Sequence, residues 1–158
     1  MRQDLRGRPP DVSRVETKLL IGEYPRVCDV EWLKTEHGVT AVVSLQHESD
    51  LWDKGVAIVE LGAEYARHGM EFHRVPVEDY NETDLDALLS RAVGTLHGLL
   101  SGGHTVFLHC NAGYNRAPTV AIAYLCTHHG MRLAAAVEHV KSQRPCVPYV
   151  TLLRKRFE

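Results

Sequence analysis

Hydrophobic positions along the chain follow two patterns: short runs that are almost wholly apolar, and longer segments in which apolar residues recur every three or four positions. The first pattern is typical of buried strands and the second of amphipathic helices. The short runs predict strands at residues 18–21, 40–45 and 105–109, and a further strand, closed by Pro76, is predicted at residues 71–77. The longer segments predict helices at residues 29–37, 56–67, 84–100, 118–129, 133–143 and 148–157, the third capped by Thr83 or Asp84.

The alternation of strands and helices predicts an α/β fold, in which helices flank a central, mostly parallel sheet on both faces. Residues 1–16 begin with basic residues, glycine and two prolines, so we expect a flexible N-terminal lead-in before a single domain over residues 17–158. In such sheets the ligand site lies beyond the carboxyl ends of the strands. The segment after the predicted strand at 105–109 is therefore the first place to look for chemistry.

Composition excludes several classes of protein. The chain has 18 Lys and Arg against 20 Asp and Glu, which argues against nucleic-acid binding. No apolar run approaches the ~18–20 residues that span a bilayer, and the N-terminus has no apolar segment of a secretory signal. The four cysteines (Cys28, Cys110, Cys126 and Cys146) form no CxxC pair, as is usual in a reducing cytoplasm. We expect a cytoplasmic protein with no nucleic-acid or membrane partner, and the oligomeric state stays open.

Residues 109–118, HCNAGYNRAP, combine a cysteine, a glycine, an arginine and a predicted helix start. The strand delivers Cys110 to the edge of the sheet, Gly113 permits a tight loop, and Pro118 suits the first turn of a helix. The N–H groups of the loop then converge on one anion, which Arg116 can hold through two oxygens. The same positive field favours the thiolate form of a cysteine. An inert buried cysteine, the alternative, leaves the glycine, the loop length and the arginine unexplained.

These observations predict a phosphate-binding loop with a sulfur nucleophile beneath it. Cys110 is the predicted nucleophile and Arg116 the predicted clamp, with His109 in a supporting position at the end of the strand. The predicted phosphate-binding residues are Asn111, Ala112, Gly113, Tyr114, Asn115 and Arg116.

Displacement of an alcohol from phosphorus also needs a proton donor for the leaving oxygen. The polar loop at residues 77–84 precedes the long predicted helix, and Asp79 within it is our candidate for this general acid. Asp84 is the alternative acid, although its position also suits a helix N-cap. Glu78 and Glu82 are typical of solvated loop charges.

Residues 109–118 resemble the signature of the cysteine-dependent protein tyrosine phosphatase superfamily, in its dual-specificity branch. Within that branch the chain is most similar to glucan phosphatases of the laforin and plant starch-excess types, through residues 21–22, 44–46, 77–85, 92–96, 109–125 and 143–146. The resemblance implies a protein tyrosine phosphatase-like fold and a two-step hydrolysis through a cysteinyl-phosphate on Cys110. It also implies that Asp79 acts first as acid and then as base, with no metal or other cofactor.

One position departs from the superfamily pattern, in which Ser or Thr commonly follows the arginine of the loop. Here Ala117 follows Arg116, and the starch-excess enzymes are similar in this detail. The departure predicts a slower second step, unless Thr119 or Asn111 supplies the missing hydrogen bond.

Aromatic side chains near the predicted loop suggest the substrate. Tyr80 follows the candidate acid, Tyr114 lies inside the phosphate-binding loop, and Trp52 lies in the predicted loop after the second strand. Apolar ring faces suit sugar rings, whose hydroxyls stay hydrated, so these three residues are a candidate substrate platform. We expect a phosphorylated glucan as substrate. The alternative is a phosphoprotein, with hydrolysis of phosphotyrosine and of phosphoserine or phosphothreonine.

Overall fold

The short apolar runs form the centre of one five-stranded sheet. The structure, a computed structural model, describes residues 6–158. The strands are β1 (Val12–Glu16), β2 (Leu19–Gly22), β3 (Ala41–Ser44), β4 (Glu71–Arg74) and β5 (Val106–His109). Their order is β1-β2-β5-β3-β4, with β1 antiparallel to β2 and all other neighbours parallel. The predicted α/β fold with a mostly parallel central sheet is confirmed.

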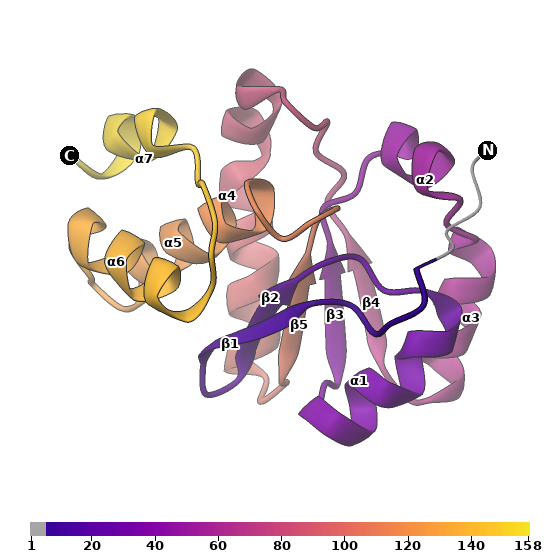
Figure 1. The fold of residues 1–158 in the computed structure, drawn as a ribbon. Coiled ribbons are helices and arrows are strands. Elements are labelled where there is room, and N and C mark those ends of the chain that lie inside the picture. The colour runs from indigo at the N-terminus through magenta and orange to yellow at the C-terminus, as the bar shows by residue number, and fades with distance from the viewer. Residues whose placement is uncertain (1–5) are drawn as a thin grey trace.

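Helices cover both faces of this sheet (Figure 1). They are α1 (Val30–His37), α2 (Glu48–Lys54), α3 (Ile58–Arg67), α4 (Glu82–Ser101), α5 (Arg116–His128), α6 (Leu133–Gln143) and α7 (Val150–Phe157), with a 3-10 turn at Val27–Asp29. Because side chains alternate across a strand, Leu19 and Val43 join the core under α4 to α7, while Leu20 and Val42 join the core under α1 and α3. None of the described helices is long and apolar enough to cross a membrane.

Strand β1 corrects the prediction of a flexible lead-in at residues 1–16. The strand lies at the edge of the sheet, where Ser13 pairs with Ile21 of β2. Val15 is its one fully buried side chain, so the sequence lacks the apolar run that marks the inner strands. The lead-in prediction is therefore wrong for Val12–Glu16, while residues 1–5 lie outside the described residues.

Helix α2 was not predicted, and it places Trp52 on a helix rather than in a loop. The helix is short and mostly polar, with Leu51 as its buried apolar side chain. A capping box starts it: the His47 side chain accepts from the backbone N–H of Ser49, and Asp50 Oδ2 accepts from the His47 N–H (2.8 Å). Local hydrogen bonds rather than hydrophobic periodicity therefore define this element.

Beside the predicted site, the starts of α4 and α5 differ from the prediction. The N-cap of α4 is Asn81, whose Oδ1 accepts from the N–H of Asp84 at 2.9 Å, and not Thr83 or Asp84. Helix α5 begins at Arg116, so Pro118 lies inside the first turn, where its missing N–H leaves no hydrogen bond unmade. The predicted phosphate clamp is therefore itself part of a helix N-terminus.

Parallel register brings the carboxyl ends of three strands together. Ser44 is the register partner of His109 on one side and of Arg74 on the other. Beyond Arg74 the chain still follows β3, since the N–H of Val75 donates to Ser44 O (2.9 Å) and the N–H of Val77 to Leu45 O (3.0 Å). The loops after β3, β4 and β5 therefore leave the sheet side by side.

Candidate active site

A pocket of about 520 Å³ opens where these three loops meet. Cys110 and Arg116 line it from the loop after β5 and the first turn of α5, and Asp79 lines it from the loop before α4. The other lining residues are Ser49, Asp50, Asp53, Lys54, Glu78, Tyr80, Asn111, Ala112, Tyr114 and Asn115. The structure thus places the predicted nucleophile, clamp and acid in one pocket.

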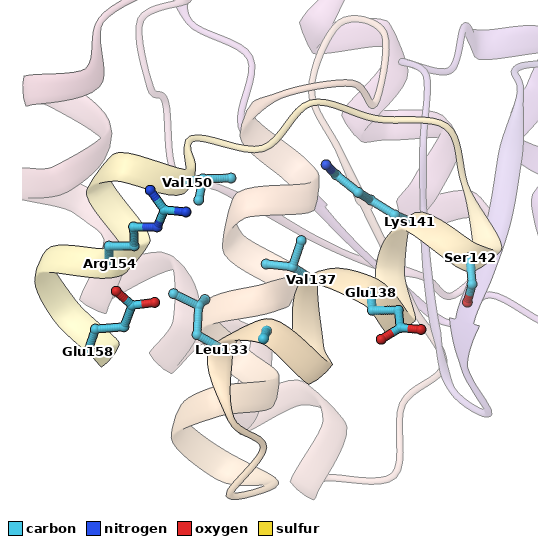
Figure 2. Close-up of a pocket in the computed structure, with 9 residues that line it drawn as sticks. Leu133, Val137, Glu138, Lys141, Ser142, Val150, Arg154 and Glu158 are labelled. Carbon is cyan, nitrogen blue, oxygen red and sulfur yellow. The ribbon is translucent and has the colours of Figure 1, made fainter.

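A second pocket, of about 570 Å³, lies between α6 and α7 (Figure 2). Its floor is aliphatic, with Leu133 and Val137, and charged side chains surround it. Its lining hydroxyl, on Ser142, donates to the carbonyl of His139 at 2.6 Å. The Ser142 proton is thus engaged with the backbone, and the predicted site residues line the pocket around Cys110 instead.

The loop after β5 is held from outside through its carbonyl groups. Each carbonyl of residues 111–115 accepts a hydrogen bond. Tyr24 N donates to Asn111, Arg144 donates to Ala112 through Nη2 and to Gly113 through Nε, Val147 N donates to Tyr114, and Thr119 Oγ1 donates to Asn115. A peptide N–H points opposite to the preceding carbonyl, so these bonds turn the N–H groups toward the pocket. Among the described residues, no N–H of 111–115 donates to a protein acceptor. The arrangement is a ready anion site above Cys110.

Gly113 is required by the path of this loop. Its φ is +66°, in the left-handed region. A Cβ at this position would lie 2.5 Å from the carbonyl carbon of Gly22 in β2. The loop therefore approaches the sheet more closely than any side chain permits.

Arg116 is 2% exposed and anchored on one edge of its guanidinium group. Nη1 donates to Asp50 Oδ2 and to the carbonyl of Val77, both at 2.7 Å. Burial disfavours its charge, but the hydrogen bond to Asp50 and the charges of Cys110, Asp50 and Asp79 outweigh this and raise its pKa. The other edge, through Nε, pairs with Asp79 Oδ1 at 3.4 Å. A guanidinium edge of this kind can hold two oxygens of an anion.

Asp50 is a functional residue that the sequence analysis missed. Its carboxylate is buried and joins two parts of the site, because Oδ2 accepts from Arg116 while Oδ1 accepts from Asn111 Nδ2 at 2.8 Å. Arg144 was missed as well: it is 4% exposed and holds the carbonyls of Ala112 and Gly113 at 2.8 Å each. No local pattern marks Asp50, whereas Arg144 lies in a stretch that the family resemblance covers.

The two candidate acids, Asp79 and Asp84, have different positions around the loop before α4. Asp79 lines the pocket and pairs with Arg116, whereas Asp84 is absent from the lining. Asp84 Oδ2 accepts from the backbone N–H of Glu78 at 2.7 Å, within the same loop. Glu78 lines the pocket mouth with an exposed side chain, and Glu82 is exposed on the first turn of α4.

His109 lies beneath the loop and is fully buried. Burial lowers its pKa to about 4, against the smaller opposing effect of its hydrogen bond to the carbonyl of Cys110. The imidazole is therefore neutral at physiological pH, and Nδ1 donates to that carbonyl at 3.1 Å. This hydrogen bond fixes the backbone at Cys110.

The three candidate platform residues lie in different places. Tyr80 and Tyr114 line the pocket, with 86% and 46% of their surface exposed. Trp52 is 67% exposed on α2 and is absent from the lining. Tyr80 has φ +58°, a strained conformation for a residue other than glycine.

Both side chains considered as substitutes at Ala117 are already engaged. The Thr119 hydroxyl donates to the carbonyl of Asn115 (2.7 Å) and accepts from the N–H of Tyr149 (2.9 Å). The Asn111 amide donates to Asp50 and accepts from Gln46 Nε2 at 2.9 Å. The Thr119 proton is therefore committed, whereas the Asn111 amide, which has two N–H donors, uses one of them on Asp50.

Two further cysteines, Cys126 and Cys146, are held in the thiol form. Burial raises the pKa of the Cys126 and Cys146 thiols, and no disulfide joins the cysteines of the described residues. Within residues 6–158 no group of three or more His, Cys, Asp or Glu side chains is arranged to hold a metal ion.

Comparison with known proteins identifies the family of this chain. Residues 19–154 match the family described as "Dual specificity phosphatase, catalytic domain". The chain is similar to the phosphatidylglycerophosphate phosphatase PTPMT2 of Arabidopsis thaliana, with 33% identity over 85% of this chain and 56% of that protein. It is similar to the phosphoglucan phosphatase DSP4 of Castanea sativa, with 32% identity over 80% of this chain and 34% of that protein.

Laforin of Mus musculus is 29% identical, over 85% of this chain and 44% of laforin. The chain thus spans less than two thirds of each of these relatives. Among solved structures it is similar to human DUSP28, with a TM-score of 0.69, 25% identity and coverage of 95% of this chain and 95% of that one. The resemblance stated from residues 109–118 is confirmed: the chain belongs to the dual-specificity phosphatase family, within the protein tyrosine phosphatase superfamily.

Proposed function

We propose that the chain hydrolyses phosphate monoesters through a cysteinyl-phosphate on Cys110. In the first step the sulfur attacks phosphorus, the bond from phosphorus to the leaving oxygen breaks, and Asp79 gives its proton to that oxygen. In the second step Asp79 takes a proton from water, the water oxygen attacks phosphorus, and the bond to sulfur breaks to release inorganic phosphate. Arg116 and the loop N–H groups hold the phosphoryl oxygens throughout.

The observation that carries this proposal is the outward-turned carbonyl row of residues 111–115, which directs its N–H groups at the space above Cys110. Two variants test the roles. Cys110→Ser is expected to abolish turnover, and persisting activity would contradict the mechanism. Asp79→Ala is expected to slow alkyl phosphates far more than activated aryl phosphates, whose leaving groups need little protonation. Equal slowing of both substrates would remove Asp79 from the role of acid.

For the substrate we propose a phosphorylated glucan, on the basis of the pocket mouth. Tyr80 and Tyr114 present exposed rings beside the phosphate site, where they can stack on sugar faces. The rest of the mouth is acidic, since Asp53 and Glu78 stand against a single cationic side chain there, Lys54. Carboxylates accept hydrogen bonds from sugar hydroxyls but repel polyanionic headgroups. A neutral chain that carries one phosphate fits this lining best.

Three substrates separate the alternatives that the family and its named relatives raise. Phosphate release is measured from phosphorylated amylopectin, from phosphotyrosyl and phosphothreonyl peptides, and from phosphatidylglycerophosphate in detergent micelles. The proposal expects the highest kcat/KM on amylopectin. A peptide preference would instead support a protein phosphatase, and a micelle preference a lipid phosphatase.

Tyr80 offers a matched pair of variants for the platform. Tyr80→Phe keeps the ring and is expected to retain activity on amylopectin, whereas Tyr80→Ala is expected to lower it about tenfold, the value of a stacking contact near 1.4 kcal/mol. Both variants should leave a small aryl phosphate within about twofold, because that substrate does not reach the rim. Trp52→Ala, tested alongside, shows whether the platform continues along α2.

A further inference from the structure

We propose that Asp84 is a positioning residue, which holds the general-acid loop over the pocket through the backbone N–H of Glu78. The inference rests on the proposed function, because it concerns how Asp79 reaches the leaving oxygen. It assigns a task to a side chain that the chemical steps do not use.

The loop is fixed at its first end by the sheet and the site. The N–H of Val77 donates to Leu45 O at 3.0 Å, and the carbonyl of Val77 accepts from Arg116 at 2.7 Å. At the second end, Leu85 is buried in the core and locks the first turn of α4 in place. The intervening residues, which include Asp79, have no buried side chain to hold them.

Asp84 joins these two ends. Its Oδ2 accepts from the N–H of Glu78 at 2.7 Å, while its own N–H donates to Asn81 Oδ1 at 2.9 Å. Asn81 Nδ2 in turn donates to Glu78 Oε2 at 3.1 Å. The backbone on both sides of Asp79 is therefore tied to one rigid turn of helix.

The loop needs this tie because its backbone is strained. Tyr80 adopts φ +58° with its ring 86% exposed, so packing contributes little to hold that conformation. The N–H of Tyr80 donates to Asp79 Oδ1 at 3.1 Å, which links the turn directly to the orientation of the acid. Without the Asp84 carboxylate we expect Tyr80 to relax and Asp79 to leave Arg116.

The experiment compares two substrates that differ in their need for a proton. Phenyl phosphate has a basic leaving group that needs the acid, and 2,4-dinitrophenyl phosphate has one that departs without it. Asp84→Ala is expected to lower kcat/KM about tenfold on phenyl phosphate, part of the 10²–10⁴ that a general acid supplies, and less than about twofold on the dinitrophenyl ester. Retained activity on the second substrate shows that the variant is folded.

Two further variants sharpen the test. Asp84→Asn keeps an oxygen that can accept from the N–H of Glu78, so it is expected to recover the phenyl phosphate rate to within about threefold of the parent. Glu82→Gln removes an exposed carboxylate from the same turn of helix and should change neither rate. On phenyl phosphate, kcat/KM should fall toward high pH as the general acid loses its proton. We expect this fall to be smaller in Asp84→Ala and to regain its parent size in Asp84→Asn.

The outcomes separate this inference from the proposed function. If Asp79→Ala slows phenyl phosphate selectively but Asp84→Ala slows both substrates equally, or neither, the positioning role is wrong and the mechanism stands. If Asp84→Asn is as slow as Asp84→Ala, an acceptor at this position is not what matters, which also overturns the inference. If Asp79→Ala itself shows no selectivity, the proposed acid is wrong.

Discussion

Replacing Asp50 by Asn tests whether the site depends on a buried carboxylate outside the signature loop. The two oxygens of Asp50 accept three hydrogen bonds: Oδ2 from Arg116 Nη1 (2.7 Å) and from the His47 N–H (2.8 Å), and Oδ1 from Asn111 Nδ2 (2.8 Å). An amide has one acceptor oxygen where the carboxylate has two. One of these contacts therefore becomes donor against donor unless its partner is reoriented.

The structure decides how the amide would sit. An NH₂ group at the Oδ2 position would face two donors, neither of which can be reversed. At the Oδ1 position it would face only Asn111, which can flip if Gln46, its own donor, flips with it. We therefore expect the amide oxygen to stay on Arg116, with the amides of Asn111 and the buried Gln46 reoriented.

The magnitude follows from what Arg116 keeps. A charged acceptor is replaced by a neutral one, a difference of about 1–2 kcal/mol for one hydrogen bond. Full loss of a buried partner would cost about 3–5 kcal/mol, but Arg116 still has the carbonyl of Val77 at 2.7 Å and Asp79 at 3.4 Å. We expect the free energy of unfolding to fall by about 2–3 kcal/mol. We also expect kcat/KM to fall about 10- to 100-fold as the guanidinium loses its fixed orientation.

The assay is urea unfolding together with kcat/KM on a small aryl phosphate and inhibition by vanadate. Glu48→Gln is the control, because Glu48 lies on the same helix, carries the same charge and pairs with Arg74 at 2.8 Å while 69% exposed. An exposed pair of this kind contributes at most about 1 kcal/mol. Tighter vanadate binding with an unchanged kcat/KM in Asp50→Asn would refute the reasoning, since it would show that Asp50 acts only as a charge.

Gly113→Ala should abolish vanadate binding, because the new Cβ would lie 2.5 Å from the Gly22 backbone; Gly130→Ala, at φ +63° with no neighbour within 4 Å, should lose only about 1–2 kcal/mol of stability and keep full activity. For His109, burial lowers the pKa from 6.5 to about 4, so the unfolded state takes up a proton first and stability is lost as pH falls through this window. Urea unfolding should show the parent losing roughly 3 kcal/mol more than His109→Asn between pH 7 and 4, and parallel curves would contradict this. Ala117→Ser should speed the second step about tenfold, seen as a smaller stopped-flow burst of aryl alcohol; an unchanged burst would mean that the second step does not need a hydroxyl there.

The elements that can be predicted from the sequence are those with a regular pattern of buried apolar side chains. Strands β2, β3 and β5 are four-residue runs of buried residues, and the apolar face of α4 recurs over its whole length. Strand β1 and helix α2 escaped prediction for a physical reason. The former pairs on one side only and the latter is held by a capping box, so neither needs a periodic apolar face. Hydrogen bonds between backbone and short polar side chains leave little trace in hydropathy.

The residues of the candidate site also fall into two groups: those that a local sequence pattern indicates and those that only the folded chain brings together. Cys110, Gly113 and Arg116 belong to one contiguous loop, so spacing and chemistry together indicate them. Asp50 acts on Arg116 from 66 positions away, and Arg144 holds Gly113 from 31 positions away. Their roles depend on parallel register and on which carbonyls point outward, which are properties of the folded chain alone.

The hydrogen bonds of Thr119 and Asn111 bear on whether either side chain can replace the hydroxyl that is missing at Ala117. Both residues carry a hydrogen-bond donor and lie in or next to the phosphate-binding loop in the sequence. Each already uses that group elsewhere: the Thr119 hydroxyl ties α5 to Tyr149, and the Asn111 amide joins Asp50 to Gln46. Turning the Asn111 amide away would leave the buried Asp50 carboxylate short of a donor, at about 1–3 kcal/mol, and turning the Thr119 hydroxyl away would break its bonds to Asn115 and Tyr149. In the proposed mechanism the departing thiolate therefore relies on the loop N–H groups and Arg116, and position 117 is where a hydroxyl donor can be added without breaking an existing side-chain bond.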